Sequence, residues 1–207
     1  MPYPLASPLS RCLAASWRIS MQSKNNVDQL LAESFKSLAL RMPIDKITIK
    51  QITDGAGVIR PTFYNHFCDK YELLEWIIHT EILDPVIPLI QEGELKNSMI
   101  QIFQNMLKDK RFYKKVVRLE GQNSCESIAR KFIMEILYTF INEQAVEKKL
   151  AKRGLTTSLV AEYYAQSMAF VVIQWTKMDM SLTPEQMADI FEYITAHSMD
   201  DVIAEMN

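Results

Sequence analysis

Apolar residues recur at helical spacing along almost the whole chain, and no stretch shows the period of two that is typical of a half-buried strand. The pattern predicts a first helix that begins near Asn26 and ends before Pro43, because a proline disfavours helical backbone at the residue before it. A second helix is expected to follow Thr48, which forms a capping-box pair with Gln51. The sequence therefore predicts an all-α fold.

Helix-start and helix-end signals divide the rest of the chain. The Gly-Ala-Gly corner at 55–57 ends the second helix, and Pro61 suits the first turn of a very short third helix. Asp69 and Glu72 open a fourth helix, which is expected to end or bend near Pro85. Further helices are predicted at about 94–108, 124–153, 156–177 and from 183 onward, with a partly helical segment at 109–123. We expect an N-terminal helix-turn-helix unit of three to four helices, followed by a larger C-terminal helical bundle.

The first twenty residues differ in composition from the rest of the chain, since they contain three prolines and no acidic residue. Arg11 interrupts the only apolar stretch that a secretory signal would need. We expect residues 1–24 to form a disordered or loosely attached arm, and Met21 precedes a sequence that reads like a natural beginning. The other interpretation is a basic arm that touches a polyanion through Arg11 and Arg18.

Composition excludes several classes of protein. A chain that is 48% hydrophobic and 23% charged is typical of a soluble globular protein with a sizeable core. Three cysteines without a close pair argue against a disulfide framework or a Cys zinc site, and suit a reducing cytoplasm. No apolar run approaches the roughly 18–20 residues that cross a bilayer. The net charge of −2 does not by itself indicate nucleic acid, although the N-terminal part is mildly basic.

Two helices joined by a glycine-containing turn, the second one short and polar, form the helix-turn-helix arrangement. Phe63 and Phe67, four residues apart, would anchor the short helix to the next one. This leaves five polar residues outward or along its edges, namely Arg60, Thr62, Tyr64, Asn65 and His66. A helix of this kind fits the major groove of DNA, where Arg reads guanine or grips phosphate and Asn reads adenine. The alternative is a plain solvated surface.

The run TIKQITDGAGVIRPTFYNHFCDKYELL resembles the DNA-binding module of the TetR family of bacterial transcriptional regulators. The resemblance rests on the cap Thr, the Ala-Gly-Val corner, the Thr-Phe-Tyr-x-His-Phe run and the trailing Asp-Lys-x-x-Leu-Leu. It implies an all-α homodimer with a variable C-terminal body that binds a small effector or a partner protein. By position, it implies DNA-backbone contacts from Thr48, Thr62, Tyr64, His66 and Lys70, and base contacts from Lys50, Arg60, Pro61 and Asn65.

Two positions depart from the family pattern. Ile59 replaces a polar residue that is common at the corner, so one backbone hydrogen bond is expected to be unmade. Thr53 replaces a small apolar residue. With this resemblance, the chain divides into the arm at 1–24, a helix-turn-helix DNA-binding domain at 25–82 and a helical effector-binding and dimerisation domain at 83–207.

The helix expected at 156–177 is apolar nearly all round, which indicates burial on several sides. Small residues line one side of it, and we expect this stripe to form a four-helix dimer interface with the segment 183–203. The predicted interface residues are Ala161, Ala165, Ala169, Ile190 and Ile194. A two-fold dimer of this kind would bind a near-palindromic operator. The alternative is that the stripe belongs to the core of one chain.

Aromatic and methionine residues of the body offer a candidate effector pocket. They are Phe103, Met106, Tyr113, Phe132, Tyr138 and Met168. Plain core packing is the competing interpretation, and the basic run at 108–118 meets either an anionic ligand, an acidic partner or only solvent. The body is similar to the Firmicutes-type branch of the family, in which some members act through a partner protein.

No catalytic constellation is visible. Glu75 and His79 lie one turn apart without a third metal ligand nearby, and there is neither a Gly-rich phosphate loop nor a nucleophile elbow. We expect no metal, no cofactor and no enzymatic activity. The sequence predicts a cytoplasmic, sequence-specific DNA-binding regulator that acts as a homodimer, either as a repressor or as an activator. The alternative is a protein–protein adaptor or co-regulator that kept the TetR-like fold and lost DNA binding.

Overall fold

The computed structural model describes residues 25–140, 154–197 and 199–206. Every regular element in these ranges is a helix, which confirms the predicted all-α class. The arm expected at 1–24, and the last part of the helix expected at 124–153, lie outside the described residues.

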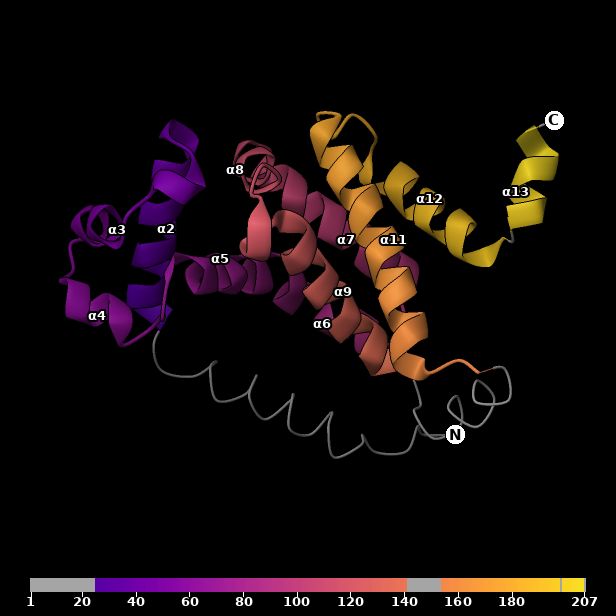
Figure 1. The fold of residues 1–207 in the computed structure, drawn as a ribbon, viewed down its shortest axis with the longest axis horizontal. Coiled ribbons are helices and arrows are strands. Elements are labelled where there is room, and N and C mark those ends of the chain that lie inside the picture. Colours follow the sequence, from indigo (N-terminus) through magenta and orange to yellow (C-terminus); the bar gives the residue numbers. More distant parts are fainter. Residues whose placement is uncertain (1–24, 141–153, 198, 207) are drawn as a thin grey trace.

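The N-terminal helices gather at one end of the molecule (Figure 1). They are α2 (Asn25–Arg41), the 3₁₀ turn η1 (Ile44–Lys46), α3 (Ile49–Ala56) and α4 (Arg60–Tyr64). Helix α5 (Lys70–Ile78) then runs from this end into the rest of the chain. The module is therefore joined to the body by one continuous helical segment.

The path beyond α5 stays helical but changes its winding. A π-helical turn, η2 (His79–Leu83), leads into the 3₁₀ turn η3 (Asp84–Val86) and then into α6 (Ile87–Gln91). Pro85 and Pro88 lie in the first turns of η3 and α6, where a missing N–H costs least. The α-helical winding of α5 thus ends before Pro85, in agreement with the expectation that this helix ends or bends there.

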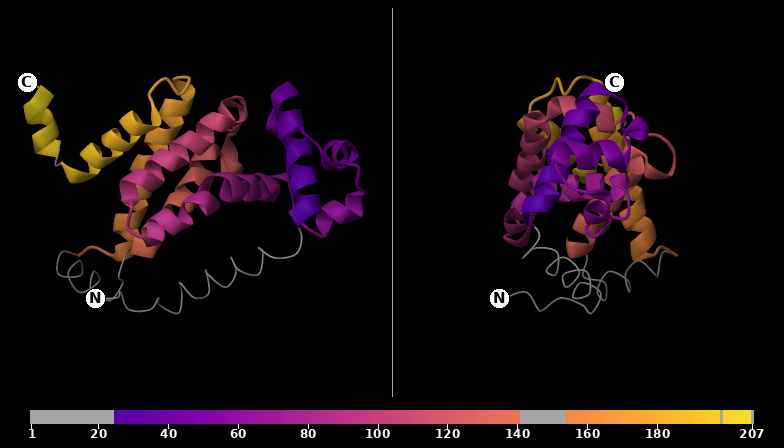
Figure 2. Two further views of the ribbon diagram at one scale, coloured as in Figure 1. Left: turned by 180° about the vertical axis from the view of Figure 1, so that it is seen from behind. Right: turned by 90° about the vertical axis from the view of Figure 1, so that its left-hand side faces the viewer.

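The body contains the remaining helices, and all of them except α13 gather around α7 and α11 (Figures 1 and 2). They are α7 (Leu95–Lys108), α8 (Lys110–Val116), the 3₁₀ turn η4 (Gly121–Asn123), α9 (Cys125–Phe140), α11 (Thr157–Lys177), α12 (Pro184–Ala196) and α13 (Met199–Met206). Helices α9 and α11 lie along each other, and α12 packs on α7. Helix α13 stands at the end of the molecule opposite α3 and α4.

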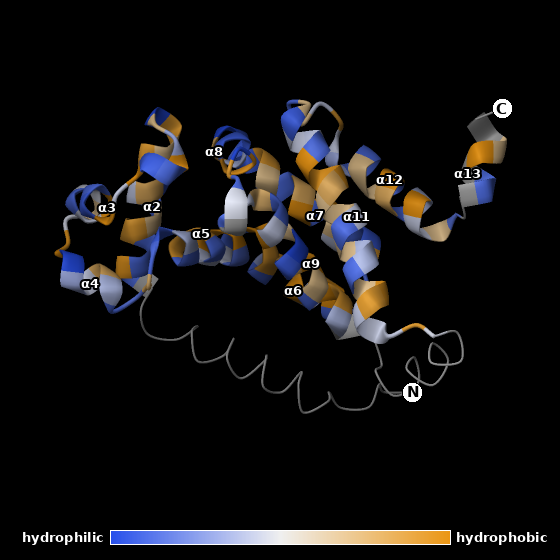
Figure 3. Ribbon diagram, in the orientation of Figure 1, coloured by the Kyte–Doolittle hydropathy of each residue, from blue (hydrophilic) through white to orange (hydrophobic). Residues whose placement is uncertain are grey.

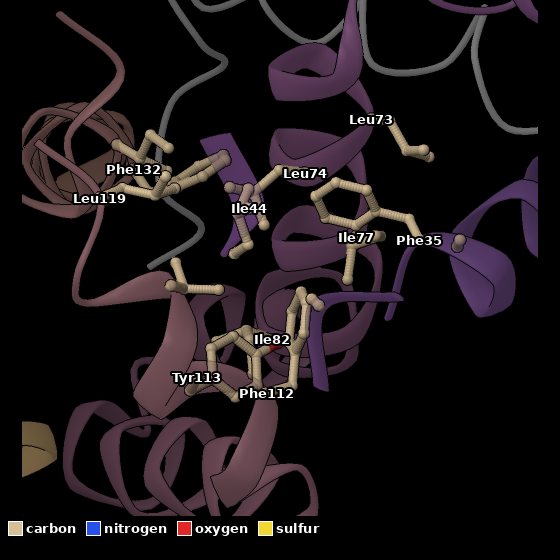
Figure 4. Packing of buried hydrophobic residues seen from close by; sticks show 14 of the residues in the cluster. Phe35, Ile44, Leu73, Leu74, Ile77, Ile82, Phe112, Tyr113, Leu119 and Phe132 are labelled. Atoms are coloured by element: carbon tan, nitrogen blue, oxygen red, sulfur yellow. The ribbon is translucent and has the colours of Figure 1, made fainter. Parts of the chain in front are cut away.

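One buried apolar cluster extends from the N-terminal module into the body (Figure 4). Phe35 of α2 meets Phe112 of α8 edge to face, with ring centroids 6.2 Å apart. Ile77 of α5 and Ile82 of η2 are buried in the same cluster. Colouring by hydropathy shows that α4, in contrast to this core, consists mainly of hydrophilic residues (Figure 3).

The alanine stripe on α11 is buried inside the chain, so the prediction that it forms the dimer interface is corrected. Ala161, Ala165 and Ala169 are fully buried within the chain, and α9 is the helix that packs most extensively on α11. Small residues let two helices approach closely, and here the close neighbour belongs to the same chain. The competing interpretation, a core role for the stripe, is the one that the structure supports.

Another face of α11 remains open to solvent. Tyr163 is 67% exposed and Phe170 is 59% exposed, and Leu159 is also exposed. On α12, Ile194 is exposed, whereas Ile190 is half-buried against the core. In the described ranges, no helix combines the length and the apolar composition that a membrane span requires.

Candidate nucleic-acid interface

Local sequence signals fix both ends of α3. The Thr48 hydroxyl accepts a hydrogen bond from the Gln51 backbone N–H at 3.3 Å, and the Gln51 side chain accepts from the Thr48 N–H at 2.9 Å. Such a cap stabilises a helix by about 1 kcal/mol. At the other end Gly57 adopts a left-handed backbone with φ of 70°, which glycine takes without strain. The predicted capping box and glycine corner are both confirmed.

Helices α2 and α3 cross at very close range. The Ser34 hydroxyl donates to the Ile52 carbonyl at 2.8 Å, and a Cβ atom at Gly55 would collide with that hydroxyl. Glycine at 55 is therefore needed for the crossing rather than for its backbone angles. Thr53 is buried, and its hydroxyl donates to the carbonyl groups of Ile49 and Lys50 at 3.0 Å, so a polar residue is accommodated there.

Two phenylalanines anchor α4, as the sequence predicts. Phe63 is fully buried and Phe67 is nearly so. Their ring centroids lie 5.9 Å apart, and Phe67 meets Trp76 of α5 at 6.0 Å. Burial of each ring contributes about 1.5–3 kcal/mol, so the orientation of α4 is set by the core beneath it.

The opposite edge of α4 faces solvent. Arg60, Pro61, Tyr64 and Asn65 are exposed, and Tyr64 is 51% exposed. The Arg60 guanidinium donates to the Tyr64 hydroxyl at 3.3 Å, one turn along the helix. Thr62 is half-buried between the two faces. The structure thus brings these predicted residues together on one edge.

Lys50 adds a cation beside this edge. Its side chain is exposed on α3, and its ammonium group lies 2.6 Å from the carboxylate of Asp54, one turn further on. An exposed pair of this kind contributes little to stability and is easily exchanged for another partner.

His66 does not point outward, which corrects the predicted orientation. Its Nδ1 lies 2.5 Å from Oδ1 of Asp28 on α2, and the two side chains are only 13% and 11% exposed. The pairing fixes one ring nitrogen inside the module. Sequence reasoning missed Asp28 because nothing local links it to a residue 38 positions later.

Lys70 is also used inside the module. Its ammonium group donates to three carbonyl oxygens, those of Ile44, Asp45 and Ile47, at 2.6–3.0 Å. These groups surround the 3₁₀ turn η1, so Lys70 closes that turn from the start of α5. Desolvation by burial lowers the pKa of Lys70. The Lys70 ammonium group is therefore bound within the protein, whereas the sequence predicted that it would be free to contact the DNA backbone.

Ile59 stands at the start of α4 without any capping bond. It is the N-cap residue of the helix, and its side chain makes no hydrogen bond to the first turn. The side chain is 69% exposed.

A polar link joins the module to the body. Lys36 of α2 forms ion pairs with Glu81 of η2, at 2.8 Å, and with Asp109 between α7 and α8. Tyr113 lies nearby in the core, and its buried hydroxyl lacks a hydrogen-bond partner among the described residues. Burial raises the pKa of Tyr113 well above its usual value, with Glu81 and Asp109 adding to the effect. Nothing in the nearby sequence signals this link.

The predicted effector residues are distributed through the core. Phe103 packs edge to face on Trp175, with ring centroids 5.2 Å apart, and also meets Phe191. Phe132 is buried against His79. Tyr113 is buried, and the other members, Met106, Tyr138 and Met168, are half-buried. These contacts are those of core packing.

An open cleft of about 600 Å³ lies elsewhere in the body. Its walls come from α8, η4, the start of α9 and the end of α11, and they include Lys114, Arg118 and Lys177 together with Glu120 and Glu126. The six predicted effector residues are not among its lining residues. Burial raises the pKa of the Cys125 thiol in this cleft to about 12, so the sulfur stays protonated.

The anchored α4, the glycine corner after α3 and the exposed polar edge define a helix-turn-helix protein with an all-helical body. The sequence profile of a transcriptional regulator C-terminal region, TetR_C_8, matches residues 93–197, just over half of the chain. The chain belongs to the TetR family of transcriptional regulators.

Individual relatives agree with this assignment. The HTH-type dhaKLM operon transcriptional activator DhaS of Lactococcus lactis subsp. lactis (strain IL1403) is 24% identical over 98 residues, which are 47% of this chain and 52% of that protein. The chain thus matches about half the length of this curated relative.

Solved structures share the fold. The dihydroxyacetone kinase operon activator DhaS superposes with a TM-score of 0.55 at 17% identity, over 83% of this chain and 94% of that one. NalD, the secondary repressor of the MexAB-OprM multidrug efflux pump in Pseudomonas aeruginosa, gives 0.52 at 18% identity, over 80% and 92%. At this identity the likeness concerns the fold.

Proposed function

We propose that this chain is a sequence-specific DNA-binding regulator that binds double-stranded DNA through residues 25–82 and acts in the cytoplasm by binding rather than by catalysis. The observation that carries the proposal is the exposed edge of α4, which the buried Phe63 and Phe67 hold outward. Arg60 and Asn65 on this edge would reach base edges, and Tyr64 would contact phosphate. Lys50 would join them from α3, on exchange of Asp54 for a phosphate.

The predicted backbone contacts from Thr48, Thr62, His66 and Lys70 differ in what the structure leaves open to them. Thr48 and Lys70 already donate within the module. His66 pairs through Nδ1 with Asp28 and is only 13% exposed. We therefore assign the positioning of the recognition helix to Thr48, His66 and Lys70, and direct contact mainly to the residues of the exposed edge.

Footprinting on the DNA that flanks the gene tests the proposal, followed by titration of the protected fragment at several salt concentrations. With about 4–8 phosphate contacts, affinity should fall several-fold for each doubling of salt. Arg60→Ala should relax base preference at one position, whereas Tyr64→Ala should weaken all sequences alike. Binding that ignores both salt and sequence would refute the function.

We propose that two copies act together on a near-palindromic operator. The support is the apolar face of α11 that lies open to solvent, through Leu159, Tyr163 and Phe170, with Ile194 on α12. These residues replace the buried alanine stripe as the proposed dimer interface. A two-fold pair would place two recognition helices about one duplex turn apart, or a multiple of it.

We further propose that residues 83–207 receive a signal, from a small molecule or from a partner protein. Membership of the family supports a regulatory role. The structural neighbours of this chain include an operon activator and an efflux-pump repressor, so both activation and repression are compatible with the fold. The cleft between α8 and α11 is one open cavity in the described part of the chain that could serve this role.

A second candidate is an adaptor that kept the fold without binding an operator. The use of Lys70 inside the module and the pairing of Lys50 with Asp54 favour it, because both reduce the cations that face DNA. The salt titration separates the two functions, since an adaptor would show no salt-dependent binding to any fragment.

A further inference from the structure

Ile59 breaks two local rules at once. The N-cap position of a helix strongly favours Ser, Thr, Asp or Asn, because their side chains accept a hydrogen bond from a backbone N–H of the first turn. The side chain of Ile59, the N-cap residue of α4, cannot accept such a bond. Its branched apolar side chain is also the most exposed of the large hydrophobic side chains in the described ranges, at 69%. Violations that folding does not require are expected at functional positions.

The backbone of Ile59 explains why the side chain is open. With φ of −87° and ψ of 153°, the residue is extended, and its carbonyl accepts the Thr62 N–H at 3.0 Å. The backbone therefore begins α4 correctly while the side chain projects away from the core. Phe63 faces inward from the same short helix and is fully buried. The Ile59 side chain therefore faces solvent, and the Phe63 side chain faces the core.

The neighbourhood indicates what the side chain meets. Ile59 directly precedes Arg60, at the N-terminal end of the helix that the proposed function places in the major groove. N-terminal residues of a recognition helix contact base edges. Among the groups that the base pairs present in that groove, the apolar one is the C5-methyl of thymine.

We propose that Ile59 is a specificity-determining residue that packs on a thymine methyl group of the operator, next to the base pair read by Arg60. The inference rests on the proposed function. It converts the departure from the usual corner residue into a preference for an A·T pair at one position of each half-site.

Thymine-to-uracil substitution tests this directly, because uracil keeps the base pairing and lacks only the methyl group. Each thymine of one half-site in the footprinted operator is replaced in turn, and the dissociation constant is measured at fixed salt. With the wild-type protein, uracil at one position should weaken binding about fourfold, the usual effect of one buried carbon. That position should adjoin the one at which Arg60→Ala relaxes preference.

Three variants assign the effect to the side chain. Ile59→Ser should bind the thymine and uracil operators equally, yet melt at or above the wild-type temperature, because Ser caps the helix. Ile59→Val should retain most of the discrimination. Met178→Ser, which removes a similarly exposed apolar side chain from the end of α11, should leave it unchanged.

The outcomes separate the two hypotheses. Specific operator binding without any uracil effect, or a uracil effect that persists in full in Ile59→Ser, overturns this inference and leaves the proposed function standing. Failure to bind any fragment specifically overturns both.

Discussion

Asp28 and His66 tie the first helix of the module to the end of the recognition helix. The carboxylate Oδ1 and the imidazole Nδ1 lie 2.5 Å apart, and both side chains are almost completely covered. Because α4 contains only the five residues Arg60–Tyr64, it has few contacts of its own to hold it. The pair therefore supplies a second attachment in addition to the buried phenylalanines.

Asp28→Ala should destabilise the protein by about 1–3 kcal/mol, since it leaves a nearly buried imidazole nitrogen without its partner. Asp28→Asn should cost less, because the amide oxygen still accepts from Nδ1. Urea unfolding measures both effects. Glu33→Ala, at an exposed acid on the same helix, should change stability by no more than about 0.5 kcal/mol. Equal effects at the two positions would contradict a structural role for the pair.

Gly55→Ala should destabilise the module, although alanine normally stabilises a helix interior by about 1 kcal/mol relative to glycine. The sign reverses because the new methyl group would collide with the Ser34 hydroxyl. Overpacking of this kind costs about 1–3 kcal/mol. In a Ser34→Ala background the penalty should shrink, so thermal unfolding of the four proteins of this double-mutant cycle gives a coupling energy. Additive effects would show that the two helices separate freely.

Sequence reasoning succeeded for α3 and α4 because their signals are local. A cap residue, a glycine with a left-handed backbone and two phenylalanines four residues apart act on neighbours in the chain. Sequence reasoning failed for side chains whose contact partners lie far away in the chain and are set by tertiary packing. Neither the pairing of His66 with Asp28 nor the burial of Ala165 within its own chain has a counterpart in the nearby sequence.

The Lys70 ammonium group should stabilise the module through its three carbonyl acceptors. Lys70→Met keeps much of the aliphatic stem but removes the ammonium donors, so each of the three carbonyl groups around η1 loses a hydrogen bond. We expect a loss of about 1–3 kcal/mol in urea unfolding. Lys46→Met, at an exposed neighbouring lysine, is the matched control and should be nearly neutral. A neutral Lys70→Met would instead return Lys70 to the set of direct DNA contacts.

Phe170→Glu should separate the two copies of the proposed dimer. A carboxylate placed in the middle of an apolar contact loses its hydration, and we expect the dimer dissociation constant to rise at least tenfold. Sedimentation velocity at micromolar concentration measures the change, and operator affinity should fall with it. Met178→Glu should leave the dimer intact. Ala165→Glu is predicted to unfold the chain rather than dissociate it, because that residue is fully buried within its own chain. A dimer that survives Phe170→Glu would place the interface elsewhere.

Asp179 should make the loop after α11 sensitive to acid. Its carboxylate lies 2.5 Å from the ammonium group of Lys114 and 2.9 Å from that of Lys110, and these hydrogen bonds lower its pKa from 3.8 to about 2. A pKa that is lower in the folded state means that the stabilisation is present above pH 4 and is lost as the pH falls toward 2.

Asp179→Asn is the matched variant, because Asn tolerates the positive φ of 63° at this position as well as Asp does. Wild type should be the more stable protein at pH 6, by a small amount that added salt reduces, since the carboxylate is exposed. The difference should shrink in unfolding measurements as the pH falls from 4 to 2, and vanish below pH 2. A difference that is the same at both pH values would mean that charge is not its cause, and that the loop geometry alone distinguishes the two side chains.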